Sequence, residues 1–365
     1  MLQSIKTGLK AVIASTALLA AAMTGANAQA DAFSCESVEL IAPYTEGGGA
    51  DVYARMFIPF LQKNLPGNPS VVIRNLPGGA SIMGNNRFQA SAKPDGCMIV
   101  VTSSSTLVAQ LLGGDKRQFD VLKWRQINVS PQGTIIYATA KTGVTGKDMV
   151  ADIEKLRGQT IRYGAKQPDA GELRNIIGYD LLELNVETIF GLARGEVRQA
   201  MMRGEIELNH DTSESYASSV QSSVDSGEFV PLWTLGFPEG ENIVRDPVFK
   251  DLPTITEAYK AVNGKDPEGP AYEAFKAFVN LGVAASKGFA LPEGTPDAIR
   301  DVYVEAIKKS MADPEFLKIA SDELGQYPQL FGDDADFAIN EAVGLSPDVS
   351  SWLKTYLLEK FDFTM

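Results

Sequence analysis

The first third of the chain alternates three times between an apolar, strand-like run, a turn rich in glycine or serine, and a helical pattern. The apolar runs are residues 38–43, 71–73 and 98–101, and the turns that follow them are 45–51, 75–81 and 102–106. This alternation is typical of a parallel sheet with crossover helices. Because the carboxyl ends of such strands meet at one edge of the sheet, the sequence predicts a ligand site there.

The composition of these turns favours an anionic ligand. Their glycines allow close approach of the backbone, and each following helix presents free N–H groups and the positive end of its dipole. Packing with helix caps at Asp51 and Ser81 is the structural alternative. Nucleotide-binding loops fit poorly, because no Gly-Lys-Ser/Thr follows the first glycines and the GxGxxG spacing is absent. Further hydroxyl donors in the turns are Ser103, Ser104, Ser105 and Thr106.

The middle of the chain repeats the strand-to-helix pattern. We expect strands at 135–139, 160–165, 206–208 and 229–235, a return strand at 279–284, and a loop at 209–212. The chain has 365 residues, which is enough for two domains of ordinary size.

The N-terminal segment predicts export. Lys6 and Lys10 precede an apolar run at 11–23, and Ala26-Asn27-Ala28 offers small residues for cleavage near Ala28. A buried N-terminal helix is the alternative. The formal net charge of the chain is −13, which disfavours nucleic acid and anionic lipid as partners. An anionic ligand would therefore need hydrogen-bond donors at its site that outweigh the repulsion from the negative charge of the whole chain.

The chain has two cysteines, Cys35 and Cys97, and each precedes a strand-like run. If these strands are neighbours in a parallel sheet, their starts lie side by side and a disulfide can form. An oxidising compartment favours this pairing over two free buried thiols.

Few residues suggest catalysis. His210 is the only histidine, so a histidine-based triad or metal site has one candidate, although His210 beside Asp211 is a possible acid–base pair. Lys166 and Arg194 are each as consistent with a ligand contact as with a solvated side chain. We predict no catalytic residue, no metal and no cofactor.

Several motifs together resemble one family. They are VELIAPYTEGGGAD at 38–51, NLPGG at 75–79, Asp95-Gly96 before a strand, a helix with Gly-Glu-Ile-Glu at 195–207, LPTITE at 252–257 and Gly294-Thr295-Pro296. In this order and spacing, they resemble the substrate-binding proteins of tripartite tricarboxylate transporters across nearly the whole exported chain.

The resemblance implies an α/β, two-lobed periplasmic-binding-protein (Venus flytrap) fold, in which each lobe is a mainly parallel sheet flanked by helices. The implied division is a signal peptide at 1–28, a first lobe beginning at 29–131, a second lobe at 132–245, and a return to the first lobe with C-terminal helices at 246–365.

Carried over by position, the ligand-binding loops would be 45–51, 78–81 and 103–106 in the first lobe and 164–171 and 209–212 in the second. The second turn has Gly-Ala-Ser at 79–81 where the family's usual turn has Ala-Gly-Gly, and Lys166-Gln167-Pro168-Asp169 replaces a Gly/Ser-rich loop. A lysine there would suit a second carboxylate. The predicted ligand-binding residues are Thr45, Gly48, Gly49, Asp51, Gly79, Ala80, Ser81, Ser103, Ser104, Ser105, Thr106, Lys166, Asp169, Asn209, Asp211 and Thr212.

The resemblance therefore implies a monomeric periplasmic solute-binding protein. It would capture a small organic anion, such as a di- or tricarboxylate, and deliver it to membrane permease subunits. A ligand-sensing receptor that docks on a membrane sensor kinase is the alternative with the same fold. A periplasmic enzyme would require turnover dependent on His210 or Lys166.

Overall fold

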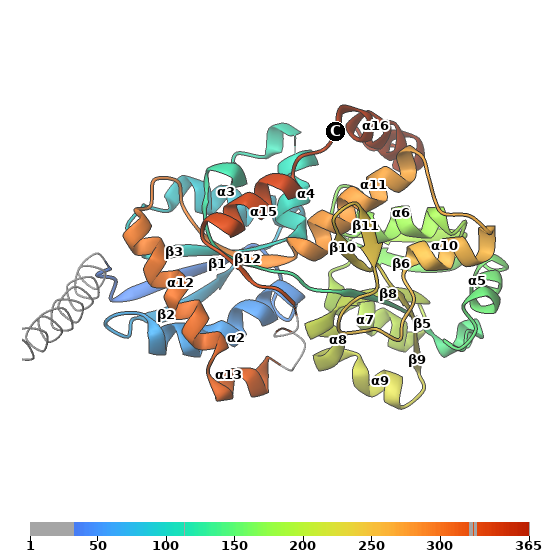
Figure 1. The fold of residues 1–365 in the computed structure, drawn as a ribbon, viewed down its shortest axis with the longest axis horizontal. Helices are drawn as coiled ribbons and strands as arrows, with labels where there is room; N and C mark the ends of the chain where they lie inside the picture. Colours follow the sequence, from blue (N-terminus) through green and yellow to red (C-terminus); the bar gives the residue numbers. More distant parts are fainter. Residues whose placement is uncertain (1–32, 113, 321–323, 325–326, 365) are drawn as a thin grey trace, which may run out of the picture.

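The computed structural model describes residues 33–112, 114–320, 324 and 327–364, so the predicted signal peptide at 1–28 lies outside the described residues. Figure 1 shows two lobes side by side, each built on its own sheet. The predicted α/β architecture of two lobes is confirmed, and both sheets are mixed. None of the helices in the described part of the chain is long and apolar enough to cross a membrane.

The sheet of the first lobe has six strands. Strands β2, β1 and β3 are parallel neighbours, whereas β12 runs antiparallel between β3 and β4. Along β3, Ile99 and Val101 face one side and Val100 the other, and all three are buried because helices cover both faces. The strand order is β13 (Leu330–Phe331), β4 (Arg125–Ser130), β12 (Lys287–Leu291), β3 (Met98–Ser103), β1 (Ser37–Ala42) and β2 (Ser70–Asn75).

The sheet of the second lobe has five strands, of which only β5 runs against its neighbours. A short hairpin, β10 (Phe237–Glu239) and β11 (Asn242–Val244), follows the last strand. The strand order is β7 (Val186–Phe190), β6 (Ile161–Ala165), β8 (Leu208–Thr212), β5 (Thr134–Thr139) and β9 (Phe229–Thr234).

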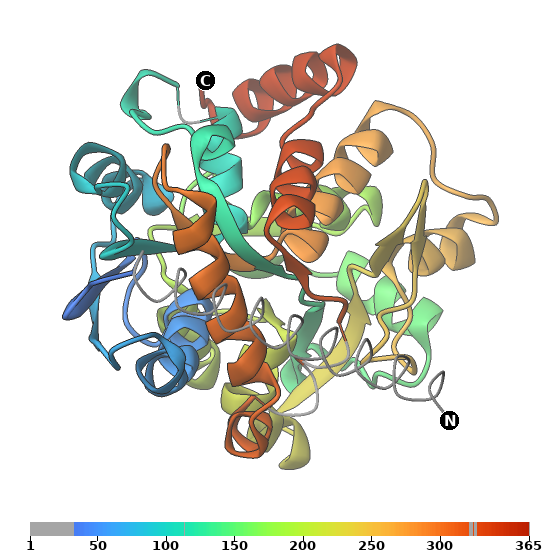
Figure 2. The same cartoon turned by 60° about the vertical axis from the view of Figure 1, so that its left-hand side comes forward.

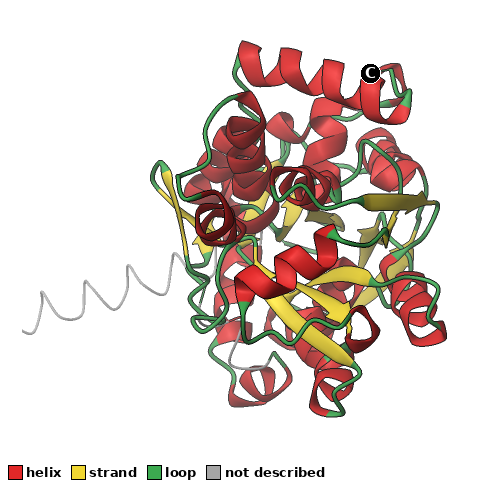
Figure 3. Cartoon of the chain, turned by 90° about the vertical axis from the view of Figure 1, so that its right-hand side faces the viewer, coloured by secondary structure: helices red, strands yellow, loops and turns green. Residues whose placement is uncertain are grey.

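Helices surround the strands of both lobes, as Figure 3 shows in red around yellow. The first sheet is covered on one face by α2 (Gly49–Asn64), α12 (Asp297–Met311) and α13 (Pro314–Ile319), and on the other by α3 (Ile82–Ser91), α4 (Ser104–Leu112) and α15 (Asp333–Ala342). Helix α12 runs lengthwise across the first lobe in Figure 2. The second sheet is covered on one face by α5 (Met149–Arg157), α6 (Leu173–Leu181), α10 (Ile255–Asn263) and α11 (Pro270–Val279), and on the other by α7 (Arg194–Arg203), α8 (Ser213–Ser219) and α9 (Gln221–Asp225).

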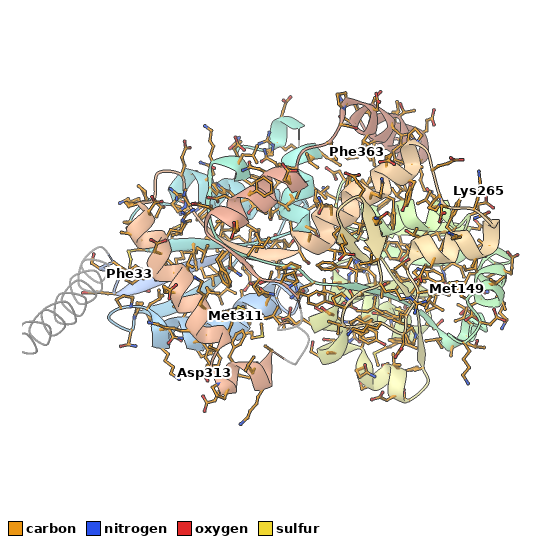
Figure 4. All side chains as sticks on the ribbon, viewed as in Figure 1. Phe33, Met149, Lys265, Met311, Asp313 and Phe363 are labelled. Atoms are coloured by element: carbon orange, nitrogen blue, oxygen red, sulfur yellow. A yellow bond between two sulfur atoms is a disulfide. The ribbon has the colours of Figure 1, made fainter. Side chains whose placement is uncertain are left out.

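Three chain segments connect the lobes. Residues 131–133 lead from β4 into β5, and residues 285–286 lead from a π-helical turn (Asn280–Ala284) into β12. The first two connections are joined directly, because the amide of Gln132 donates to the carbonyl oxygen of Val283 at 3.0 Å. The third connection follows α15 and ends in α16 (Pro347–Phe361), which packs on α11 of the second lobe. Figure 4 accordingly places Phe363 beside the second lobe, whereas Phe33 lies at the far side of the first.

The structure corrects two expectations about local structure. The segment 279–284 is the end of α11 and the π-helical turn, and the return strand is β12 at 287–291. The segment 209–212 is the buried strand β8 rather than a loop. Its polar side chains are tolerated inside because Asn209 and Asp211 are hydrogen-bonded to Tyr137 on the neighbouring strand β5, and Asn209 also to Arg194.

The predicted disulfide joins Cys35 and Cys97. Cys35 precedes β1 and Cys97 precedes β3, and these strands are parallel neighbours, so their starts lie side by side. The bridge therefore fastens the N-terminal end of the described chain to the centre of the first sheet.

Replacing both cysteines with serine should destabilise the first lobe. The sequence separation is 62 residues, and constraining a loop of this length corresponds to about 4 kcal/mol of unfolding free energy in the chain-entropy model. Urea unfolding followed by tryptophan fluorescence would measure the loss. Unchanged midpoints for the oxidised wild type and the double variant would contradict this contribution.

Candidate ligand-binding site

A cavity of about 350 Å³ lies between the two lobes, a volume at the lower end of the range for small-molecule sites. The three glycine- or serine-rich turns of the first lobe line one side of it. The other side is formed by the ends of β6 and β8, the start of α6 and the residues before α7. The cavity therefore lies at the sheet edge that the sequence predicted.

The structure brings most of the predicted site residues together around this cavity. The lining includes Thr45, Gly48, Gly49, Gly79, Ala80, Ser81, Ser103, Ser104, Ser105, Lys166, Asp211 and Thr212. Arg194 and His210, whose roles the sequence left open, also line it. Asp51, Thr106, Asp169 and Asn209 are not among the lining residues.

Two of these four residues support the first-lobe turns. Asp51 lies in the first turn of α2, where its carboxylate accepts hydrogen bonds from the amide of Gly47 at 2.9 Å and from Asn75 Nδ2 at 2.8 Å. The hydroxyl of Thr106 pairs with the hydroxyl of Tyr44 at 2.5 Å. Both side chains thus fix turns whose neighbouring residues face the cavity.

The other two residues act within the second lobe. Asp169 accepts a hydrogen bond from Gln167 Nε2 at 2.6 Å within its own loop. Asn209 is buried in β8, where it accepts from Arg194 and donates to the hydroxyl of Tyr137 at 2.7 Å. Asn209 therefore positions a cavity-lining arginine.

The second turn keeps a left-handed backbone path although its residues are not all glycine. Gly79 and Ala80 have φ values of +55° and +49°, and Ser81 has a φ of +91°. The family's usual turn has glycine at positions 80 and 81, where this conformation has no steric cost. In this chain, Ala80 and Ser81 adopt the conformation at a cost of roughly 1–2 kcal/mol each. Both residues line the cavity.

Two cationic side chains reach from the second lobe to the start of α4 in the first. Arg174, on α6, is buried and donates to Ser104 Oγ at 2.8 Å. Lys166 follows β6 and donates to Ser105 Oγ at 3.3 Å. Burial lowers the pKa of Arg174 to about 10, so the guanidinium remains charged at neutral pH. Two cationic side chains therefore lie at the N-terminal end of α4, which is the positive end of its helix dipole.

Glu172 lies beside these cations. Its Oε1 accepts a hydrogen bond from Arg194 Nη2 at 2.8 Å and lies 3.5 Å from Lys166 Nζ. Burial would raise the pKa of Glu172, but Lys166 and Arg194 outweigh that effect and lower it to about 2. Glu172 is therefore ionised at any physiological pH.

A second ion pair closes the other end of the cavity. Lys287, the first residue of β12, is 3% exposed and donates to Glu214 Oε2 at 2.8 Å and to Thr212 Oγ1 at 3.2 Å. A methyl group at Gly49 would lie 3.3 Å from Lys287 Nζ and 2.8 Å from Ser215 Oγ. Gly49 at the start of α2 therefore allows the two lobes to meet closely.

The charged residues in and behind the cavity carry an excess of positive charge. The cations are Lys166, Arg174, Arg194, Arg198 and Lys287, and the carboxylates are Glu172, Glu196, Asp211 and Glu214. Five cations against four carboxylates leave one positive charge for a ligand to neutralise. In a chain whose formal net charge is −13, this is a local reversal of sign.

His210 is neutral in this setting. Its side chain lines the cavity, and its Nδ1 lies 2.7 Å from the hydroxyl of Tyr163. Burial, followed by Arg194 and Arg174, holds the pKa of His210 well below its ordinary value. The acid–base pair of His210 with Asp211 does not fit, because the carboxylate of Asp211 is bound by Arg198 and Tyr137.

Sequence reasoning missed Arg174, Glu172 and Lys287. Arg174 and Glu172 stand at the start of a helical pattern, and Lys287 begins a strand placed in the wrong segment, so no local motif marks them. The only signal was the nearby charge of Lys166, which the sequence did assign to the site.

Two lobes that enclose a cationic cavity between crossing segments define the fold of a periplasmic binding protein. No family model matches the chain. A UPF0065 protein of Bordetella pertussis (strain Tohama I) is 26% identical over 310 residues, which cover 84% of this chain and 85% of that protein. Protein BugT of the same organism is 35% identical over 91 residues, 25% of this chain and 27% of BugT.

Solved structures share the fold. MatC from Rhodopseudomonas palustris with bound malate has a TM-score of 0.63 at 18% identity, covering 87% of this chain and 97% of MatC. A second R. palustris protein, solved with adipate, has a TM-score of 0.63 at 19% identity, covering 88% and 96% of the two chains. A TctC solute-binding protein from Polaromonas has a TM-score of 0.56 at 18% identity, covering 88% and 98%. The predicted resemblance is confirmed: the chain is similar in sequence to the UPF0065 protein and to BugT, and it shares its fold with the TctC solute-binding protein.

Because His210 is the only histidine, its titration can be isolated. The lowered pKa means that the unfolded chain takes up this proton before the folded chain does. The resulting loss of stability begins as the pH falls through the unfolded pKa of about 6.5 and amounts to about 1.4 kcal/mol by pH 5.5. Thermal unfolding from pH 7.5 to 5.5 should therefore show a shallower decline for His210→Gln than for the wild type. Parallel curves for the two proteins would refute a buried neutral histidine.

Proposed function

We propose that this chain is a periplasmic solute-binding protein that captures a small organic carboxylate, such as a di- or tricarboxylate, between its lobes. It then delivers the acid to the membrane permease subunits of a tripartite tricarboxylate-type transporter. Binding uses no cofactor and leaves the ligand chemically unchanged. The mature protein begins after a signal peptide cleaved near Ala28, and its disulfide suits an oxidising compartment.

The observation that carries this proposal is the excess of buried positive charge between the lobes. Transferring an unpaired cation from water into a protein interior is costly, and an anionic ligand removes this cost. The overall negative charge of the chain makes the reversal specific to the cavity. A neutral ligand would leave the excess uncompensated.

One carboxylate is expected to bind at the start of α4. There the hydroxyls of Ser104 and Ser105 lie beside Arg174 and Lys166. A guanidinium, an ammonium and the positive end of a helix dipole all favour a carboxylate, and charge-assisted hydrogen bonds are about twice as strong as neutral ones.

A second anionic group is expected at the start of α2. Because Gly48 has no side chain to cap the helix, the first amides of α2 remain available to an anion. Lys287, Thr212 and Ser215 approach this end of the helix from the opposite side. Two such anchors at neighbouring helix starts favour an acid with at least two carboxylates.

The contacts of Arg174 connect binding to lobe closure. Its guanidinium donates to Ser104 of the first lobe, while its own helix belongs to the second. In an open form, these groups would separate and become hydrated. An anion placed between them is bound best when both lobes contact it, so binding favours the closed form. Malate in MatC and adipate in the second R. palustris protein support a ligand of this class.

A thermal-shift screen of the mature protein against C2–C6 mono-, di- and tricarboxylates tests the proposal. A ligand at 100 times its Kd should stabilise the closed form by about 2.7 kcal/mol, whereas the corresponding amides should have no effect. If no acid shifts the unfolding temperature of protein freed of co-purified ligand, carboxylate binding is wrong.

Lys166→Met should weaken binding of the acid found in that screen by about 10- to 100-fold, since hydrogen bonds to charged groups contribute roughly 1.5–3 kcal/mol. Isothermal titration calorimetry would measure the change. Lys147→Met is the matched control, because Lys147 is an exposed lysine of the same lobe away from the cavity. Equal affinity of Lys166→Met and wild type for every acid would exclude the lysine from the site.

A further inference from the structure

We propose that the ligand carries a hydroxyl group next to a carboxylate, and that Glu172 is the residue that selects it. This inference rests on the proposed carboxylate-binding function and narrows the class of acid. The hydroxyl would donate its hydrogen to Glu172 Oε2, while the adjacent carboxylate binds Lys166 and Arg174.

The first observation is the uneven use of the two oxygens of Glu172. The side chain is 4% exposed and lines the cavity. Oε1 accepts a hydrogen bond from Arg194 and forms an ion pair with Lys166. Among the residues that the structure describes, none donates a hydrogen bond to Oε2. A buried acceptor without a partner is destabilising, so a ligand that supplies the missing donor binds more tightly.

The second observation is the charge of Glu172. Lys166 and Arg194 hold it in the ionised form against the effect of burial, which by itself raises its pKa. Both oxygens are therefore acceptors only. A ligand carboxylate facing Oε2 would be repelled, and a methylene group would leave the oxygen unpaired. The position requires a hydrogen-bond donor.

The surrounding charges favour a neutral donor over an ammonium. Glu172 already has Lys166 and Arg194 as ion-pair partners, and the positive charge of Arg174 also acts on it. An ammonium would add another cation to this group, whereas a hydroxyl donates a hydrogen bond without adding charge. Repulsion between like charges at such distances is strong in a partly buried site, so an ammonium at this position would weaken binding.

The position of Lys166 places the donor close to a carboxylate. Its ammonium lies 3.5 Å from Glu172 Oε1 and 3.3 Å from Ser105 Oγ at the start of α4. A ligand carboxylate bound to Lys166 at that helix start would therefore lie close to Glu172. A hydroxyl on the carbon next to this carboxylate would be near enough to donate to Glu172, so the proposed ligand is a 2-hydroxy acid.

Succinate, L-malate and L-aspartate form a matched series for the test, because they differ only by hydrogen, hydroxyl or ammonium at one carbon. Calorimetric titration of the full mature protein should give a Kd for malate at least 10-fold below that for succinate, in keeping with a charge-assisted hydrogen bond. Aspartate should bind more weakly than malate.

Glu172→Gln separates the role of the negative charge from the shape of the side chain. In this variant, the ratio of the succinate and malate Kd values should fall at least several-fold towards one. Glu207→Gln is the matched control, because Glu207 is also paired with an arginine, Arg162, in the second lobe but does not line the cavity. The control should keep the wild-type ratio.

Each outcome decides between the two proposals. Equal binding of succinate and malate by the wild type, or an unchanged ratio in Glu172→Gln, would overturn the selection of a hydroxyl and leave carboxylate binding intact. Tighter binding of aspartate than of malate would overturn the neutral donor. If none of the three acids binds, the inference fails, and a response to other acids in the wider screen would show that the proposed function stands without it.

Discussion

The buried guanidinium of Arg174 is the interaction on which the arrangement of the two lobes depends. It donates to Ser104 of the first lobe, to the carbonyl oxygen of Gly282 in the π-helical turn at 3.3 Å, and to Thr134 at the start of β5 at 3.5 Å. One charge thus contacts both lobes and the two elements of the second lobe from which connections to the first lobe begin. Because a buried cation is stable only with its partners in place, any hinge motion that separates these groups must hydrate Arg174. An anion between the lobes changes the free energy of that motion.

The cavity is positively charged although the whole chain is negatively charged. A ligand in the cavity responds mainly to the nearby positive charges, because distant surface charges are screened. Exposed charges more than about 8 Å apart are largely screened at physiological ionic strength, whereas buried pairs are screened much less. A carboxylate between the lobes therefore interacts mainly with the cavity cations, notably Lys166 and Lys287. The remaining surface, which gives the chain its net charge of −13, affects the rate of encounter more than the affinity.

The sequence predicted the first-lobe side of the cavity well, because a turn between a strand and a helix is a local pattern. The glycines of 45–51 and the hydroxyls of 103–106 could be placed at one sheet edge without knowing the rest of the fold. The second-lobe side could not be predicted in the same way. Arg174 and Lys287 reach the cavity only because the chain crosses between the lobes, and their neighbours in sequence form an ordinary helix and strand. The segment 279–284 was assigned as a strand because a short apolar run does not distinguish a strand from a buried helical turn.

Carboxylates in an anion-binding site repel the ligand, but they also position the cations that bind it. Glu172 and Glu214 each lower the attraction for any anion, yet they also hold Arg194, Lys166 and Lys287 in fixed positions before a ligand arrives. Fixing long side chains in advance removes part of the entropic cost of binding. The same carboxylates repel an acid that places a negative group in the wrong position, which is how specificity can exceed what attraction alone provides. Affinity and selectivity at this cavity therefore depend on how completely each carboxylate is paired, and the free oxygen of Glu172 is where a ligand can complete that pairing.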